Sequence, residues 1–200
     1  MSKSMKSFTF AIGAALLTGV ALPASAQTIG GYDGFAFVDA VKQKTGDKVM
    51  ELIRKNGPGI VNAKDASGNT ALIVAITDRN EDFTAFLLNQ GADPNLGGKG
   101  GDTPLIAAAR VGYGEAAEWL LGQGAKVDGT NRMGETALIV AVQQRQPALV
   151  RLLLSAGANP DKTDNAAGLS ARDYATRDTR SRDILQAIEA KKPKAAAASR

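Results

Sequence analysis

The chain carries few of the side chains that enzymes use for acid–base or nucleophilic chemistry. Its 200 residues include no histidine and no cysteine. Thiolate nucleophiles, disulfides, His/Cys zinc sites and catalytic triads built on imidazole are therefore excluded. Carboxylates, lysines and hydroxyls remain, but no pair of carboxylates stands out as catalytic. We expect no enzymatic activity, no metal and no cofactor, and keep an enzyme using carboxylates or a Ser-Lys pair as an alternative.

Two local patterns suggest a phosphate or a cation as ligand. The glycine-rich run Gly97–Gly101 surrounds Lys99, but it lacks the Gly-x-x-x-x-Gly-Lys-Ser/Thr spacing with which a phosphate loop cradles its ligand. Asp161, Asp164 and Asp173 do not follow the alternating ligand spacing of a calcium loop. We interpret the glycine-rich run as a flexible loop tip, and neither pattern predicts a ligand site.

The elements that would position any site are defined by a repeat of 33 residues. Two motifs keep this interval, with the first at Gly68–Ala75, Gly101–Ala108 and Gly134–Ala141, and the second at Gly91–Asn95, Gly124–Asp128 and Gly157–Asp161. Two independent motifs in one register indicate a repeat architecture.

Each repeat has the start and stop signals of two short helices. The threonine of the first motif (Thr70, Thr103 and Thr136) stands where a hydroxyl caps a helix start. After a short break, a second apolar-periodic stretch containing a pair of leucines or Phe-Leu-Leu predicts another helix. The first glycine of the second motif suits the left-handed conformation that ends a helix. Each repeat is therefore predicted to be a helix-turn-helix hairpin.

A hairpin of two short helices cannot bury its apolar side alone, so successive hairpins must stack in a row. Residues 65–167 hold three clear repeats. Residues 35–62 predict a diverged first helix pair, and residues 168–188 predict a final pair in which Arg172 takes the place of a core leucine. Such a replacement fits a terminal unit, because its outer face must be polar. The fold class is predicted to be all-α.

These motifs resemble the ankyrin repeat, whose pattern includes Gly-x-Thr-Pro-Leu-His-x-Ala and, later, Leu-Leu-x-x-Gly-Ala-Asp-Val-Asn. The resemblance implies a solenoid of about five helix-turn-helix units with short loop or β-hairpin fingers, which grips a partner with its concave face. One position departs from the pattern, since the histidine is Ile73, Ile106 and Ile139 here. This exchange removes side-chain hydrogen bonds that tie neighbouring loops in ankyrin proteins and substitutes apolar burial.

The first 26 residues have the pattern of a cleavable secretory signal. Lys3 and Lys6 precede an uncharged apolar run over residues 8–22, and an Ala-Ser-Ala sequence ends at Ala26. We predict cleavage after Ala26 and a periplasmic or secreted protein. No membrane span is expected after cleavage.

The remaining chain divides into a linker at residues 27–34, a repeat domain at residues 35–188 and a basic, Ala-rich tail at residues 189–200 that we expect to be disordered. The net charge of +4 belongs to the two ends, because residues 27–188 hold 18 basic and 19 acidic side chains. The predicted fold therefore offers no basic surface for nucleic acid.

The family pattern places ten candidate partner-binding residues on the concave face. They are Asp78, Lys99, Asp102, Arg110, Tyr113, Arg132, Met133, Glu135, Gln143 and Gln144. Arg, Tyr and Met are enriched in protein interfaces because they combine contact area with polar reach.

We expect a monomer that binds one partner protein, such as a periplasmic enzyme or a toxin, in an accessory, stabilising or inhibitory role. The alternative is a binder of the envelope surface or of a small molecule that uses the basic tail.

Overall fold

The computed structural model describes residues 31–190. The predicted signal at residues 1–26, residues 27–30 of the predicted linker and residues 191–200 of the tail lie outside the described residues. Within them, no helix is both long and apolar enough to span a bilayer.

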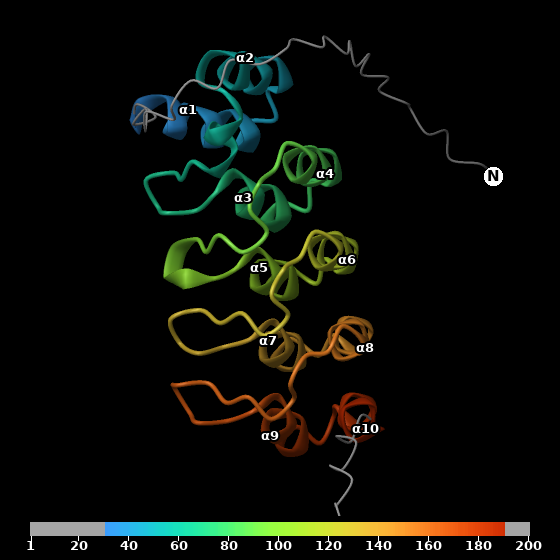
Figure 1. Ribbon diagram of the computed structural model, residues 1–200. Helices are drawn as coiled ribbons and strands as arrows, with labels where there is room; N and C mark the ends of the chain where they lie inside the picture. The colour runs from blue at the N-terminus through green and yellow to red at the C-terminus, as the bar shows by residue number, and fades with distance from the viewer. Residues whose placement is uncertain (1–30, 191–200) are drawn as a thin grey trace, which may run out of the picture.

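Within residues 31–190, ten α-helices form five antiparallel pairs that stack in one row, which confirms the predicted all-α solenoid (Figure 1). The pairs are α1 (Gly31–Lys42) with α2 (Gly46–Asn56), α3 (Ala71–Thr77) with α4 (Glu81–Asn89), α5 (Pro104–Val111) with α6 (Gly114–Gly122), α7 (Ala137–Gln143) with α8 (Pro147–Ser155), and α9 (Ala171–Arg177) with α10 (Arg182–Ala190). Two short 3-10 helices, η1 (Pro58–Asn62) and η2 (Lys99–Gly101), lie in connecting segments.

The odd-numbered helices form an inner row and the even-numbered helices an outer row. Loops project from the inner row on the side away from the outer row (Figure 1). We call these loops the fingers, and they span residues 64–70, 97–103, 130–136 and 163–170. Single antiparallel β-bridges close three of them, at Lys64 with Thr70, at Thr130 with Thr136 and at Thr163 with Ser170.

The start of each central inner helix is capped by the threonine that the repeat predicts. Thr70, Thr103 and Thr136 each accept a hydrogen bond from the backbone N–H three residues on, at 3.2 Å. In the last unit, Ser170 and Asp173 cap each other's backbone in a reciprocal capping box. The predicted cap positions are therefore confirmed.

The outer helices end at the predicted glycines. Gly91, Gly124 and Gly157 have φ of 83°, 84° and 97°. After α4, the N–H of Ala92 donates to the carbonyl of Leu87 at 2.9 Å, a pattern that recurs after α6 and α8. A residue with φ in this range is strained unless it is glycine, so these turns depend on it.

A ladder of side-chain amides and carboxylates joins each unit to the next. Asn62, Asn95 and Asp128 each accept a hydrogen bond from a backbone N–H 31 residues further along the chain, at 2.8, 2.7 and 2.9 Å. The next residue in this register, Asp161, instead accepts from Arg172 Nε at 2.6 Å. The ladder therefore ends at the last unit.

Small side chains let the inner helices approach one another closely. Ala75, Ala108 and Ala141 are at most 2% exposed, and each inner helix contacts the next. The isoleucines that replace the family histidine are 5% exposed or less. Burial of each contributes roughly 1.5–3 kcal/mol, against about 1 kcal/mol for a net hydrogen bond, so this burial is large enough to offset a lost hydrogen bond.

Both ends of the helical stack extend past the bounds expected from the sequence. Helix α1 begins at Gly31, four residues before residue 35, and α10 continues to Ala190, past residue 188. At the first end, Asp33 accepts from Lys55 Nζ of α2 at 2.9 Å in the first turn of α1, where an acid favours the helix dipole.

We predict that Thr136→Ala lowers the free energy of unfolding by about 1 kcal/mol, because the buried N-cap hydroxyl is lost. Urea denaturation followed by circular dichroism measures the change. Thr130→Ala is the matched control, since Thr130 is exposed and its hydroxyl makes no hydrogen bond within residues 31–190. Equal effects of the two substitutions would contradict the role of the cap.

Candidate functional site

The candidate site is the surface made by the fingers and the exposed side of the inner helices, which we call the inner face. Nine of the ten candidates lie on the fingers or near the ends of inner helices. Lys99, Asp102, Arg132, Met133 and Glu135 are finger residues. Asp78, Arg110, Gln143 and Gln144 lie at the ends of α3, α5 and α7.

Three of the four fingers are folded by hydrogen bonds to one side chain near their start. The Oδ1 atoms of Asp65, Asn131 and Asp164 each accept two backbone N–H groups of their own loop, at 2.7–3.0 Å. These residues lie 66 and 33 residues apart in the sequence. Their recurrence in the repeat register is a signal that the sequence analysis did not use. The finger backbones are therefore fixed by their own sequence.

The second finger departs from this rule because Gly98 occupies the equivalent position. A Cβ at Gly98 would lie 2.7 Å from both Asn69 Oδ1 and Ile73 Cδ1, so any other residue would displace these two side chains. The N–H of Lys99 donates to that Asn69 Oδ1 at 2.9 Å, and the N–H of Arg132 donates to the carbonyl of Gly100 at 3.0 Å. The glycine-rich run is thus a defined turn held from both sides, which corrects its interpretation as a flexible tip.

Four side chains form a hydrogen-bonded cluster at the centre of the inner face, which we call the Arg110 cluster. Arg110 donates to Asp102 through Nε at 2.6 Å and to Glu135 through Nη2 at 2.9 Å. The amide of Asn131 donates to the same two carboxylates at 2.7 and 2.8 Å. The hydrogen bond to Asp102 is the main cause that raises the pKa of Arg110. The cluster links α5 to two fingers, so its charges are engaged within the protein.

The positions of Tyr113 and Glu135 correct two of the candidates. Tyr113 is 5% exposed, because its ring turns inward at the start of α6, packs edge-on against Trp119 and lies under the Arg79 guanidinium at 5.4 Å. Glu135 is 9% exposed, because Arg110 and Asn131 draw its carboxylate into the cluster. Tyr113 therefore does not lie on the inner face, and Glu135 offers little surface to a partner.

The exposed candidates fall into two groups. Lys99, Arg132 and Met133 lie on adjacent fingers, and Met133 is 49% exposed. Gln143 and Gln144 lie at the end of α7, where Gln143 borders a shallow depression of about 350 Å³. The depression is lined by Val142, Gln143, Arg145, Tyr174, Arg177 and Asp178. Asp78 is exposed at the end of α3, apart from both groups.

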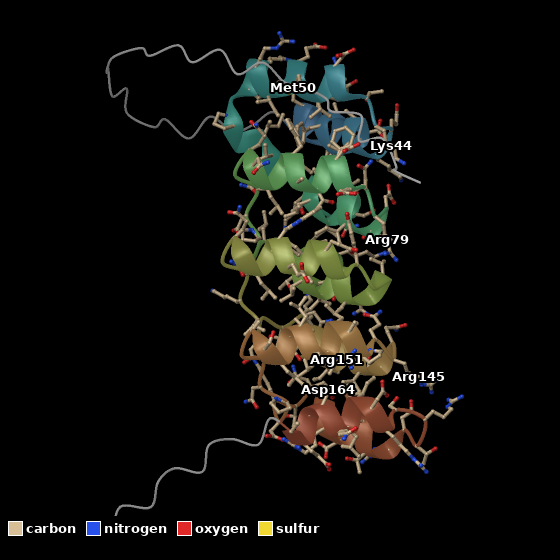
Figure 2. All side chains as sticks on the ribbon, turned by 90° about the vertical axis from the view of Figure 1, so that its right-hand side faces the viewer. Lys44, Met50, Arg79, Arg145, Arg151 and Asp164 are labelled. Atoms are coloured by element: carbon tan, nitrogen blue, oxygen red, sulfur yellow. The ribbon has the colours of Figure 1, made fainter. Side chains whose placement is uncertain are left out.

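The turns between inner and outer helices carry arginines that the sequence reading did not single out. Arg79 and Arg145 adopt φ of 50° and 53°, where Gly112 stands in the intervening unit. They lie along one edge of the stack with Lys44 (Figure 2). Each reaches the next turn, since Arg79 donates to the carbonyl of Val111 at 3.3 Å and Arg145 to Asp178 at 2.6 Å. The Arg145 guanidinium holds the pKa of Asp178 far below its usual range.

The last finger is joined to α9 by a tyrosine and a buried carboxylate. Asp164, which is 4% exposed, accepts a hydrogen bond from the Tyr174 hydroxyl at 2.6 Å. Burial raises the pKa of Asp164, but the hydroxyl and the backbone N–H groups of the loop outweigh it, so the pKa lies below its ordinary value of 3.8. Asp164 is therefore ionised at neutral pH.

Comparison with known proteins assigns the repeats to a family. The model described as "Ankyrin repeats (3 copies)" matches residues 96–164, and the model "Ankyrin repeat" matches residues 67–99. The chain is an ankyrin-repeat protein. Ankyrin repeats are generally protein-protein interaction modules and are typically not enzymes. A search of curated proteins found no match.

The side chains of the ankyrin inner face are of types that contribute to binding. In the described part of the chain, no group of three or more acidic side chains is arranged to hold a metal ion. Asp161, Asp164 and Asp173 have separate partners in Arg172, Tyr174 and Ser170. The exposed groups are cations, amides, the Asp78 carboxylate and one thioether, which supply ion pairs, hydrogen bonds and apolar contact to a partner.

We predict that Arg110→Gln lowers the free energy of unfolding of the ankyrin domain by about 1–2 kcal/mol, because Glu135 and Asn131 lose a charged partner near the surface. Arg132→Gln, the matched control on the next finger, should change it by less than about 0.5 kcal/mol. Urea denaturation at constant salt measures both. The assignment of Arg110 to a structural cluster fails if the two variants are equally stable.

The Asp164–Tyr174 pair predicts a dependence of stability on acid. A carboxylate whose pKa is lowered by folding stabilises the protein above the unfolded pKa, and this stability is lost as pH falls through the folded pKa. Tyr174→Phe should raise the pKa of Asp164, lower stability at pH 7 by about 1–2 kcal/mol and move acid unfolding to higher pH. Acid titration followed by circular dichroism measures the shift.

Tyr32→Phe is the control for that titration, since Tyr32 is 85% exposed and its hydroxyl makes no hydrogen bond among residues 31–190. An unchanged acid midpoint in Tyr174→Phe would show that the hydroxyl does not set the pKa.

Proposed function

We propose that this chain is a periplasmic, non-enzymatic protein that binds one partner protein through its inner face. The exposed group of Lys99, Arg132 and Met133 is the main support for this proposal. These residues stand on fingers whose backbones are already held by hydrogen bonds, so a partner does not have to order the loops.

The periplasmic location rests on the sequence of residues 1–26, with its two lysines, its apolar run and its Ala-Ser-Ala end. The absence of cysteine is consistent with an oxidising compartment. In that compartment the protein would stabilise, escort or inhibit its partner.

The experiment compares partner capture by three forms of the tagged protein after crosslinking in the native cell. They are the wild type, Lys99→Glu/Arg132→Glu and Arg151→Glu. Arg151 is exposed on α8 and its side chain makes no ion pair within the described residues, and it lies on the outer-helix face that Figure 2 presents. It therefore controls for a reversal of charge away from the inner face.

We expect the tagged chain in the periplasmic fraction to begin at Gln27. The finger double variant should lose at least about tenfold of the captured partner, since several contacts at an interface centre carry most of the binding energy, while Arg151→Glu keeps it. Circular dichroism and melting should be unchanged in all three. A partner lost with Arg151→Glu and kept by the double variant would place the interface on the outer helices.

The tail supplies the competing function. Lys191, Lys192, Lys194 and Arg200 make it basic, so a variant that ends at Ala190 belongs in the same comparison. Loss of envelope association or of capture in that variant alone would favour the tail over the inner face.

A further inference from the structure

The acidic and the basic side chains of the fingers differ in how many contacts they make within the protein. Every acid in the four fingers accepts hydrogen bonds from within the chain. Asp65 binds its own loop, Asp102 and Glu135 bind Arg110 and Asn131, and Asp164 binds Tyr174. The hydrogen-bonding capacity of these carboxylates is therefore partly used within the protein, and Asp102 and Glu135 share the positive charge of Arg110.

The basic side chains of the fingers make fewer contacts within the protein. Lys64 donates to the carbonyl of Gly97 at 2.6 Å, but the side chains of Lys99 and Arg132 make no hydrogen bond and no ion pair within residues 31–190, and both are exposed. Their fingers are joined by the hydrogen bond from the N–H of Arg132 to the carbonyl of Gly100 at 3.0 Å. Two unpaired cations thus stand on adjacent, connected loops.

An apolar side chain stands beside these cations. Met133 is 49% exposed and directly follows Arg132. Its N–H donates to Asn131 at 2.9 Å and its carbonyl accepts from the N–H of Asn165 at 2.8 Å. The backbone is held while the flexible thioether remains free to adapt to a partner.

We propose that Lys99, Arg132 and Met133 bind an acidic segment of the partner protein that also carries an apolar side chain. This inference rests on the proposed function and specifies the partner's chemistry. The Arg132 guanidinium takes a carboxylate in two hydrogen bonds, Lys99 takes a second carboxylate, and Met133 packs on the apolar group.

The charge of the rest of the molecule favours a protein segment over nucleic acid or an anionic membrane. Residues 31–190 hold 18 basic and 20 acidic side chains, a net charge of −2. The exposed acids Glu81, Asp82 and Glu115 lie in the first turns of the outer helices α4 and α6, and Glu118 is exposed in the middle of α6. A long polyanion would meet these acids, whereas a short acidic segment needs only the fingers.

The test uses the full mature protein and a labelled synthetic peptide in which four glutamates flank one leucine. Control peptides carry glutamine or lysine in place of glutamate, or serine in place of leucine. Binding is followed by fluorescence anisotropy. A carbodiimide, which joins an amine to a carboxylate in contact, then maps the bound peptide by mass spectrometry.

We expect the acidic peptide to couple mainly to Lys99 and to bind at least about tenfold more weakly to Lys99→Glu/Arg132→Glu than to Arg151→Glu. Lys99→Arg should keep binding within about twofold and lose the coupling, because the charge stays and the amine goes. The serine peptide should bind about threefold more weakly, and added salt should weaken all binding.

The proposal is overturned if coupling spreads equally over Lys48 and Lys126, which are exposed elsewhere, or if the glutamine or lysine peptide binds as well as the acidic one. It is also overturned if duplex DNA or vesicles containing anionic lipid displace the acidic peptide, bind more tightly than it does, and lose this binding in Lys99→Glu/Arg132→Glu. A captured partner that depends on the fingers but presents no acidic segment would refute this inference and leave the proposed function standing.

Discussion

Each helix pair in this protein buries its apolar side only against the pairs beside it, and the position of every finger follows from that stacking. The inner helices pack closely because alanines recur at their contacts, as at Ala75, Ala108 and Ala141. The ladder of Asn62, Asn95 and Asp128 fixes each unit relative to the next. Because the contacts are between neighbours, a change in one unit alters the two interfaces that it shares.

The same stacking explains why the acids of the inner face are hydrogen-bonded within the protein while two of its cations are exposed. Finger backbones bend sharply and need acceptors for their N–H groups, and short acidic or amide side chains supply them. The acids of the fingers are used in this way, or in the Arg110 cluster, which ties α5 to the fingers on both sides. Lys99 and Arg132 have no such structural task, so their charges remain available at the surface. The architecture of the loops thus leaves two exposed cations on the inner face, although the fold as a whole is not basic.

The sequence predicted the regular parts of the structure because those parts depend on local rules repeated in register. Thr70 and its equivalents cap helices, and Gly91 and its equivalents end them, whatever the surrounding packing. The candidate site was predicted less well. The register places Tyr113 at a turn but does not say which way its ring points, and the ring packs inward on Trp119. Glu135 is buried because Asn131 and Arg110, which reaches across from another unit, both bind its carboxylate. The direction of a side chain and its contacts with other units are tertiary properties, which a 33-residue sequence pattern does not specify.

The pairing of Arg172 with Asp161 determines where the solenoid stops. In the preceding units, the equivalent of Asp161 receives a backbone N–H from the following unit, whereas here the guanidinium of Arg172 occupies that acceptor at 2.6 Å. The equivalents of Arg172 in the central units are the buried leucines at 72, 105 and 138. One side chain therefore both removes an apolar surface and fills the last free acceptor. A leucine in place of Arg172 would expose an apolar surface at the end of the stack. Copies of the chain would then associate end to end through this surface and form filaments.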